Sequence, residues 1–352
     1  MKYEYKAIGR GDMMADKRVG KQTVKLGNPP SVISTVSIVG PKEGDGPLRQ
    51  TFDLVIDDEM WGEKTWEKAE SKIVREAWSR VLEKASKTPD DINYVIAGDL
   101  LNQCIATTFG LRGSSVPYLG IYGACSTVCE SLGIGSLLID GGFADNVVCI
   151  TSSHFCSAEK QFRFPLELGT QRPPTAQWTV LGCGGALISN QGQGPYITHV
   201  TAGKIVDMGV NDANNMGGAM APAAADTIVN HFKDTGFTPD YYDLILTGDL
   251  GIVGKSICEE IVNESGFHVS EKLNDCGLMI FDRIRQDVHA GASGCGCSAT
   301  VFAGYIYQEI MKGNLKKVFL VATGALLSPT SIQQGESIPS IAHGITLSST
   351  LQ

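Results

Sequence analysis

The sequence predicts a layered α/β fold made of two similar halves related by a pseudo-twofold axis. Two observations carry this expectation. Apolar strands alternate with helices along most of the chain, which is the pattern of α/β units. Short motifs also recur in the same order in both halves, which indicates an internal duplication. With 352 residues, the chain is long enough for two such units around a sizeable core.

The duplication is visible in three pairs of matching stretches. The first pair lies 150 residues apart (99 to 249) and the other two lie 171 apart. The pairs are residues 88–100 with 238–250, residues 123–126 with 294–297, and residues 142–150 with 313–321. We therefore expect two β-α-β-α-β units with buried central helices. The expected organisation is a flexible extension over 1–20, an N-terminal half over 21–195 and a C-terminal half over 196–352.

The elements of the first half follow from local patterns. Residues 31–39 alternate as a strand, and apolar residues recur at spacings of three and four over 65–85, which predicts a long amphipathic helix. Short apolar runs at 94–97, 118–122 and 146–151 are typical of buried strands. Between the last two runs, the stretch after Cys125 predicts a helix that is apolar on every side.

The first half ends with a segment of a different kind. Residues 155–178 are rich in aromatic residues, arginine and proline, and we expect an irregular functional cap or interface loop there. Lys160, Arg163 and Arg172 either form a rim that attracts anions or lie on an ordinary solvated face. A strand at 186–189 and a linker at 190–195 close this half.

Composition excludes several classes of protein. The net charge is −9 without a basic cluster, which argues against nucleic-acid binding and direct electrostatic attachment to anionic lipid. Ten scattered cysteines are typical of reduced thiols in a cytosolic protein. No secretory signal is recognisable, and apolar runs such as 318–321 are too short to span a bilayer. Any membrane association is therefore expected to be peripheral or through a partner.

The most informative stretch is Gly123-Ala124-Cys125-Ser126-Thr127, where an apolar strand runs into a small-residue turn that opens a helix. Unpaired amides and the macrodipole at a helix N-terminus favour a thiolate or another anion. Cys125 is therefore a candidate pocket residue or nucleophile. The alternative is a small buried side chain that fills a tight turn.

Other candidates carry weaker signals. Asp99 and Asp249 each follow a core strand, where they either cap the next helix or supply a polar group or calcium ligand to a pocket. His154 follows a strand end and His343 lies in a C-terminal turn, and each is a pocket candidate or a satisfied histidine. Cys295-Gly296-Cys297 has no second ligand pair at a suitable spacing, so no metal site is expected.

The duplicated unit with a cysteine at the tip of its buried helix resembles the thiolase superfamily, whose fold is a layered α-β-α-β-α arrangement. Longer motifs resemble the stage V sporulation protein AD family within that superfamily. They include the Cys125 turn and Met220-Ala221-Pro222-Ala223-Ala224-Ala225-Asp226-Thr227. The others lie at residues 98–103, 322–330, 332–334 and 341–344, so that the resemblance spans about residues 20–347.

The resemblance implies a function in sporulation and in spore germination. It implies binding of dipicolinic acid (pyridine-2,6-dicarboxylate), as the free acid or its calcium chelate, with no other cofactor, and uptake of that ligand into the developing spore. The implied partners are membrane proteins of the same operon and a second copy of the chain in a homodimer. The implied location is peripheral, on the cytoplasmic side of the forespore or spore inner membrane, with a protein that is soluble when expressed alone.

The same resemblance predicts a degenerate enzyme. Condensing relatives need histidine or asparagine partners for the cysteine, and the position of the first partner reads Thr247-Gly248-Asp249-Leu250, without histidine. At the second position, alignment on Gly-Ala-Ser-Gly places Val288 where the partner belongs, and His289 is one residue out. We expect no catalytic residue and treat Cys125 as an ancestral nucleophile. An active condensing enzyme on acyl thioesters and a scaffold with an empty pocket are the alternatives.

A dipicolinate pocket needs donors for two carboxylates and an apolar slot for the ring. The two matching turns sit on the pseudo-twofold axis, so we expect one helix N-terminus for each carboxylate. The expected ligand-binding residues are Cys125, Ser126, Thr127, Asp99, His154, Asp249, Ser293, Gly294, Cys295, Cys297 and His343.

Overall fold

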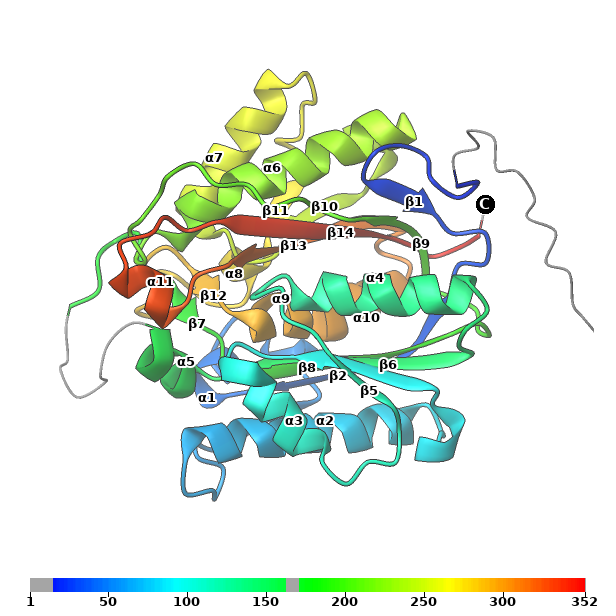
Figure 1. Ribbon diagram of the computed structural model, residues 1–352, viewed down its shortest axis with the longest axis horizontal. Coiled ribbons are helices and arrows are strands. Elements are labelled where there is room, and N and C mark those ends of the chain that lie inside the picture. The colour runs from blue at the N-terminus through cyan, green and yellow to red at the C-terminus, as the bar shows by residue number, and fades with distance from the viewer. Residues whose placement is uncertain (1–14, 163–170, 352) are drawn as a thin grey trace, which may run out of the picture.

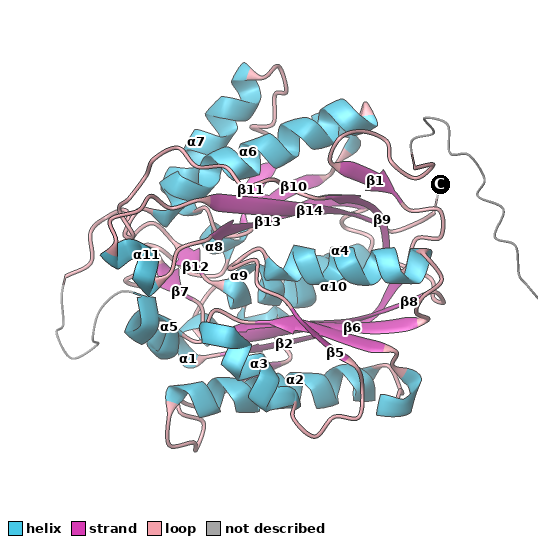
Figure 2. Ribbon diagram, in the orientation of Figure 1, coloured by secondary structure: helices cyan, strands magenta, loops and turns pink. Residues whose placement is uncertain are grey.

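A computed structural model describes residues 15–162 and 171–351 of the chain. Its elements stack in five layers, helices alternating with two β-sheets (Figures 1 and 2). The first sheet has the strand order β5-β4-β6-β8-β2. Its strands are β2 (Ser31–Val39), β4 (Tyr94–Gly98), β5 (Tyr118–Gly120), β6 (Asn146–Ser153) and β8 (Gly182–Ser189).

The second sheet repeats the first. Its order is β11-β10-β13-β14-β9, and only the pairing of Ser31 with Tyr196 joins β2 to β9. In both sheets the first three strands are mutually parallel and the last two pair antiparallel. The strands are β9 (Tyr196–Thr201), β10 (Leu244–Thr247), β11 (Leu273–Asp275), β13 (Lys317–Ala325) and β14 (Ser340–Ser348). The internal duplication inferred from the sequence is confirmed by this shared topology.

Three layers of helices enclose the two sheets. The outer face of the first sheet is covered by α2 (Trp66–Lys84) and α3 (Ile105–Leu111), and that of the second by α6 (Met216–Thr235) and α7 (Gly251–Glu264) (Figure 1). The central layer holds α4 (Thr127–Asp140) and α9 (Cys295–Val301), which continues through a π-helical turn into α10 (Tyr307–Met311). The matching turns of the sequence therefore head the two central helices.

Local chemistry explains where the first long helix forms. The Thr65 side chain accepts a hydrogen bond from the Lys68 amide and caps the N-terminus of α2. The buried face of α2 carries Ile73, Ala77 and Val81 at helical spacing, and these residues pack against the first sheet. The helix predicted over 65–85 is confirmed.

The central helix α4 is buried on most sides but not on all. A Cβ atom at Gly135 would lie 2.9 Å from Ile188 and 3.1 Å from Val147, so glycine lets the helix approach the sheet closely. On its other side, however, Leu137 is 42 % exposed. The helix predicted to be apolar on every side is therefore mostly buried, and one apolar edge at Leu137 is exposed.

The segment predicted to be irregular contains regular structure. Helix α5 (Phe155–Phe162) begins directly after β6, and β7 (Trp178–Thr179) pairs in parallel with β12 (Ala292–Ser293). Arg163 lies outside the described residues. The pairing of β7 with β12 brings the end of this segment beside the turn that heads α9. Strand β8 also begins four residues earlier than the 186–189 run predicts.

The remaining elements are short. They are β1 (Thr23–Lys25), which pairs β9, β3 (Leu54–Val55), which pairs β2, and the helices α1 (Pro41–Gly44), α8 (Cys276–Met279) and α11 (Pro329–Gln333). Within the expected N-terminal extension, Lys17 forms an ion pair with Asp140 at 2.9 Å. Among the residues described, no helix has the length and apolar character needed to cross a membrane.

Candidate functional site

Cys125 lies in the turn that precedes α4, at the centre of the molecule. Ala124, directly before it, has a φ of +49°, which residues other than glycine rarely adopt. Hydroxyl groups close the turn, since Ser126 Oγ donates to the Gly123 carbonyl at 2.6 Å and Thr127 Oγ1 donates to the Ala124 carbonyl at 2.6 Å. The amides of Ser126 and Thr127 also donate to these two carbonyls, so they are engaged within the turn.

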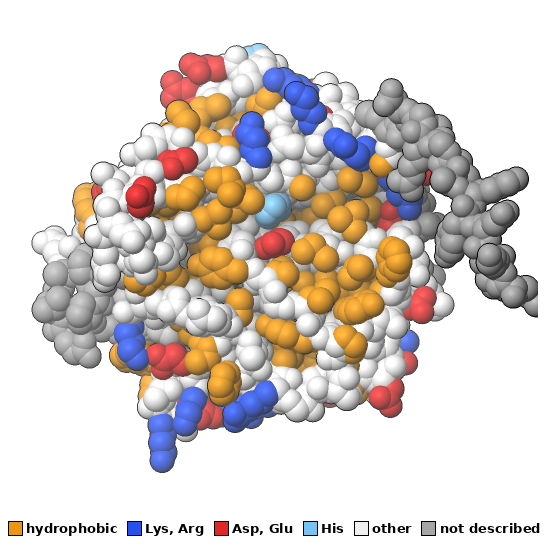
Figure 3. Space-filling model, in the orientation of Figure 1, with side chains coloured by type: hydrophobic (Ala, Val, Ile, Leu, Met, Phe, Trp, Pro, Cys, Tyr) orange, Lys and Arg blue, Asp and Glu red, His pale blue; other side chains and the backbone are white. Residues whose placement is uncertain are grey.

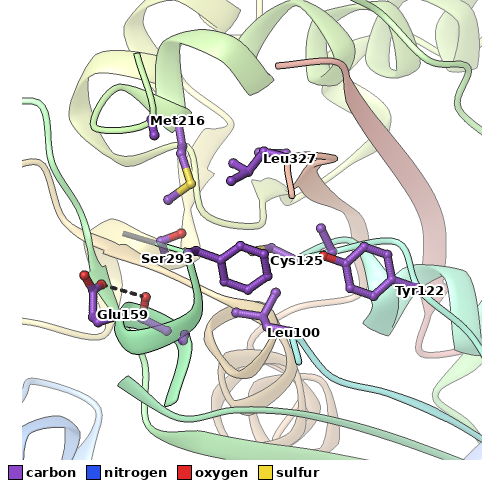
Figure 4. A pocket seen from close by; sticks show the side chains of 13 residues that line it. Leu100, Tyr122, Cys125, Glu159, Met216, Ser293 and Leu327 are labelled. Atoms are coloured by element: carbon purple, nitrogen blue, oxygen red, sulfur yellow. Dashed lines mark hydrogen bonds between the residues drawn. The ribbon is translucent and has the colours of Figure 1, made fainter. Parts of the chain in front are cut away.

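Cys125 lines a pocket between the two halves. The pocket encloses about 480 Å³ of space between its walls, a volume that includes the part open to solvent. Figure 4 shows Cys125 and Ser293 at its base and Leu100, Met216 and Leu327 around it. The other lining residues are Tyr122, Ala124, Ala158, Glu159, Phe162, Thr179, Ala213 and Ala325.

The walls of this pocket are mainly apolar. Polar groups are few: the Cys125 thiol, the hydroxyls of Tyr122, Thr179 and Ser293, and the carboxyl group of Glu159. Thr179 Oγ1 donates to Glu159 Oε1 at 3.4 Å. Among the described lining residues Glu159 is the only one with a charged side chain. The geometry suits a small, largely apolar ligand that is oriented by a few hydrogen bonds.

Asp249 lies fully buried directly behind the pocket base. Its Oδ1 accepts from Thr323 Oγ1 at 2.7 Å, and its Oδ2 accepts from Ser293 Oγ at 3.0 Å and from the Gly294 amide at 3.0 Å. The Cys125 thiol is a further hydrogen-bond partner of this carboxyl group. Three of the expected site residues, Cys125, Asp249 and Ser293, are thus brought together by elements from both halves.

This arrangement disfavours the thiolate form of Cys125. A hydrogen bond with the Cys295 thiol lowers the pKa of Cys125, but burial and the adjacent Asp249 outweigh it, and the pKa of the thiol is raised. Burial likewise raises the pKa of Asp249, against the effect of its hydrogen-bond donors. The carboxyl group of Asp249 beside the thiol therefore favours the protonated form of Cys125.

The turn that heads α9 makes different hydrogen bonds from the turn that heads α4. Its Gly294 amide donates to Asp249 and its Gly296 amide donates to Ser153 Oγ at 2.9 Å. Cys295 and Cys297 are fully buried, and Cys297 Sγ donates to the Gly248 carbonyl. These amides are engaged within the protein, so the expectation of one helix N-terminus for each carboxylate of a ligand is not supported by the geometry.

Three other expected residues do not line the pocket. Asp99 caps the segment that leads into α3, because its carboxyl group accepts from the amides of Leu101 and Thr107 and from the Thr107 hydroxyl. His154 Nε2 hydrogen-bonds to the Glu59 carbonyl. His343 Nδ1 accepts from the Gly203 amide, and burial lowers the pKa of His343 to about 4. In each case a structural partner explains the residue.

The structure also places the residues around the second expected catalytic position. Val288 is fully buried, His289 forms a contact with Asp287 at 3.4 Å, and neither residue lines the pocket. From this stretch Ser293 is the residue that faces the pocket. No group of three or more His, Cys, Asp or Glu residues in the described part of the chain is arranged to hold a metal ion.

Several pocket residues were not anticipated. Tyr122 was expected only as part of a strand, and Met216 and Leu327 carry no chemical signal in the sequence. Glu159 lies in the 155–178 segment, which the sequence marked as functional by its length and composition alone. That segment contributes Ala158, Glu159 and Phe162 from α5, and Thr179 follows directly after its last residue.

Comparison with known proteins identifies a family whose sequences match most of this chain. The family model described as Stage V sporulation protein AD matches residues 20–348. The curated protein "Stage V sporulation protein AD" from Bacillus subtilis (strain 168) is 49 % identical over 329 residues, which cover 94 % of this chain and 97 % of that protein.

Solved structures with the same fold are distant in sequence. A 3-oxoacyl-[acyl-carrier-protein] synthase III from Aquifex aeolicus is 14 % identical with a TM-score of 0.53, over 91 % of this chain and 99 % of that chain. A variant of OleA from Xanthomonas campestris is 13 % identical with a TM-score of 0.55, over 92 % and 99 %. These likenesses establish a thiolase-like α/β fold.

Proposed function

The chain belongs to the stage V sporulation protein AD family, and on that premise we propose that its pocket binds dipicolinic acid, as the free acid or as its calcium chelate. In this proposal the protein supports uptake of the ligand into the developing spore together with membrane proteins of the same operon. It acts as a peripheral protein on the cytoplasmic side of the spore inner membrane, and it does so without catalytic turnover.

One observation carries the proposal: the chain has an apolar pocket with no histidine among its described lining residues, and its Cys125 thiol has the carboxyl group of Asp249 as a neighbour. A flat aromatic ring fits apolar walls such as those formed by Leu100, Phe162 and Leu327. The Tyr122 hydroxyl supplies a donor for a carboxylate. The Ser293 hydroxyl and the Cys125 thiol supply further donors only by turning away from Asp249.

The charge of the ligand has to be balanced. Dipicolinate is a dianion, and both Glu159 at the wall and Asp249 behind the base carry carboxyl groups. Bringing the free dianion close to two ionised carboxylates costs electrostatic energy. A bound calcium ion, or protonation of Asp249, offsets that cost. The proposal therefore treats the free acid and the chelate as two ligands to be compared.

Calorimetric titration with dipicolinate, with and without calcium, tests the proposal. Ala213 lines the pocket, and Ala213→Phe adds a ring to its interior. Asn214→Phe is the matched control, because it adds the same bulk on the same loop at a position that does not line the pocket. We expect binding to the unmodified chain and to Asn214→Phe, weaker binding to Cys125→Ala, and none to Ala213→Phe. Equal binding to both phenylalanine variants, or no binding to the unmodified chain, contradicts the proposal.

An acyl-transfer function is the second candidate, because Cys125 lines a pocket in a fold shared with condensing enzymes. That function requires an acyl-enzyme at Cys125. Incubation with acyl thioesters followed by intact mass measurement separates the two candidates. A covalent acyl adduct that is absent from Cys125→Ala supports the enzyme and opposes a pure binding function.

We also propose that the chain forms a homodimer through the face that exposes β5 and one edge of α4. Leu119, Tyr122 and Leu137 are each about two-fifths exposed there, and hydrophobic side chains gather over this part of the surface (Figure 3). Apolar side chains grouped in this way are typical of interaction sites.

A further inference from the structure

We propose that a groove on the outer layer of the first half binds an acidic segment of a partner protein. The groove lies where α2 and the end of α3 meet (Figure 1), and it is lined by Arg75, Trp78, Pro89 and residues 110–115. We call it the arginine groove. Among the described residues it shares no lining residue with the Cys125 pocket, so the proposal does not depend on dipicolinate.

A close approach of the two helices brings both arginines to the groove. A Cβ atom at Gly110 would lie 2.7 Å from the Ser71 carbonyl oxygen and 2.7 Å from Val74 Cγ1, so glycine lets α3 pack directly on α2. Arg75 follows Val74 on α2, and Arg112 is the first residue after α3. The two arginines therefore line the same groove from two different helices.

These two arginines differ from the others in the described chain because their charges are unpaired. Neither guanidinium group forms a hydrogen bond or an ion pair with a described residue, and Arg112 Cζ lies 5.2 Å from the centre of the Phe109 ring. Each of the other described arginines has a carbonyl or carboxylate partner: Arg18, Arg49, Arg80, Arg172, Arg283 and Arg285. Arg75 and Arg112 are also exposed, so both charges are available to an incoming anion.

The surroundings of the groove do not neutralise this charge. Its described lining contains no acidic residue. Glu76, the neighbour of Arg75 in the chain, is paired with Arg80 at 2.6 Å. The chain as a whole has a net charge of −9, so the groove is a local positive exception on an acidic protein. Charge complementarity therefore favours a negatively charged occupant.

The groove also offers apolar surface beside the two charges. An ion pair between exposed groups contributes little to affinity, because water competes for both partners, so a small anion held by the arginines alone is bound weakly. Trp78 is half-buried between the arginines' two helices, and Pro89 and Leu111 line the groove as well. Tryptophan and arginine are the residue types that dominate the affinity of protein interfaces. A peptide segment uses both features, with carboxylates on the arginines and an apolar side chain on Trp78.

The shape of the surface favours an extended chain. A second hollow, lined by Val116 and by Tyr118 of β5, adjoins the groove, and residues 111–114 line both. Arg112 therefore stands between two hollows that a single peptide segment can follow. An anionic membrane is a poorer fit, because it needs a cluster of free cations, whereas Arg80 and Lys84 of α2 are already paired with carboxylates.

Selection from a displayed random-peptide library on the full chain tests the proposal. The library is first depleted on the double variant Arg75→Gln/Arg112→Gln, which removes peptides that bind elsewhere on the molecule. We expect the peptides enriched on the unmodified chain to combine Asp or Glu with an aromatic or aliphatic residue. Enriched peptides without acidic residues, or no enrichment after depletion, overturn the proposal.

Fluorescence anisotropy with one enriched peptide then compares single variants. Arg75→Gln and Arg112→Gln should each weaken binding about tenfold, and added salt should weaken it further. Arg80→Gln is the matched control, because it removes the same charge from α2 at a position that does not line the groove, and it should bind as the unmodified chain does. Both test arginines are exposed and unpaired among the described residues, so their variants are expected to fold, which circular dichroism verifies. An equal loss in Arg80→Gln overturns the proposal.

Three further measurements separate the groove from other contacts. Light scattering should give Arg112→Gln the same mass as the unmodified chain, and a lower mass assigns the groove to a contact between two copies and overturns the proposal. Vesicles that contain phosphatidylglycerol should not bind the chain, and vesicle binding that the double variant loses assigns the groove to a membrane instead. Dipicolinate titration should be the same for the double variant and the unmodified chain, so a failure of dipicolinate to bind counts against the proposed function only.

Discussion

At the scale of single residues, Asp249 controls the reactivity of Cys125, because it raises the pKa of the thiol. A condensing enzyme needs a group that stabilises the thiolate of its nucleophile, and a histidine serves because its protonated form pairs with the anion. Asp249 acts in the opposite sense, since an ionised carboxylate beside a thiol raises the thiol pKa. The carboxyl group has structural partners of its own in Thr323, Ser293 and Gly294, which hold it in place.

Asp249→Asn is expected to make Cys125 more reactive. The substitution removes the negative charge but keeps a side chain that can hydrogen-bond to Thr323 and Ser293, so the pKa of Cys125 falls. Each pKa unit lost raises the thiolate fraction at neutral pH by about tenfold. The alkylation rate with iodoacetamide, followed at Cys125 by mass spectrometry across a pH series, measures the change. Cys125→Ala in the same background confirms the site of labelling, and a rate that is unchanged or lower contradicts the argument.

The sequence identified this residue without explaining it. The absence of histidine at 247–250 predicted that Cys125 lacks a catalytic partner. The position of Asp249 after a core strand made it a candidate pocket residue. Its contact with Cys125 and Ser293, however, joins residues that are far apart in the chain. Long-range contacts of this kind depend on packing between the two halves. Asp99, at the matching position of the first half, instead caps a helix.

At the scale of elements, the sequence was most informative where local pattern and repetition agree. The strand at 31–39, the helix at 65–85 and the duplicated strand-and-turn motifs follow from hydrophobic periodicity and from the offsets between halves. Helix α5 was missed because its eight residues lie in a segment whose aromatic residues, arginines and prolines indicated a loop. Strand β7 has two residues and exists only through its pairing with β12, which no local signal specifies.

The short helix α1 carries a buried acid that makes stability depend on pH. Glu43 is fully buried, Glu43 Oε1 accepts from the Leu181 amide at 3.0 Å, and burial raises the pKa of Glu43 to about 7. Its folded-state pKa is above the unfolded value of 4.5, so the native state holds the proton more tightly. The associated stability is complete below about pH 4.5 and is lost as pH rises through about 7.

Glu43→Gln is expected to remove this part of the pH dependence. Between about pH 4.5 and 8, the free energy of unfolding of the variant should rise relative to the unmodified chain by up to about 3 kcal/mol. Urea unfolding at a series of pH values measures the difference in free energy of unfolding between the two chains. The test is how this difference changes with pH, and not its size at any single pH. Glu83→Gln, an exposed glutamate on α2, is the control and should show no such change. A difference that stays constant with pH shows that Glu43 does not titrate in this range.

At the scale of the whole molecule, the five-layer arrangement leaves an edge of α4 and part of strand β5 exposed on the same face. The shared topology places β5 and β11 at the outer ends of the two sheets. Leu119 and Gly120 of β5 are exposed, and the uncovered edge of α4 runs nearby on the same face of the molecule (Figures 1 and 3). A single chain in isolation does not explain why apolar side chains gather there. The sequence predicted the buried character of α4 correctly on average, but it could not show which edge stays open.

A second copy of the chain covering this face explains its apolar character. An exposed edge strand offers unpaired backbone groups, and pairing with a second β5 satisfies them. Leu119 is 39 % exposed on that strand, so Leu119→Arg places a charge in the proposed interface without opening a cavity in the core. Desolvating an unpaired arginine on association is strongly unfavourable.

Leu119→Arg is therefore expected to convert a dimer into a monomer. Light scattering coupled to size-exclusion chromatography measures the mass of each species, and circular dichroism verifies the fold. Ile252→Arg is the matched control, because Ile252 is 45 % exposed on α7, at the outer layer of the second half. The unmodified chain and Ile252→Arg should elute with the mass of two chains, and Leu119→Arg with the mass of one. A monomeric unmodified chain, or a dimer that persists in Leu119→Arg, removes the β5 face as the interface.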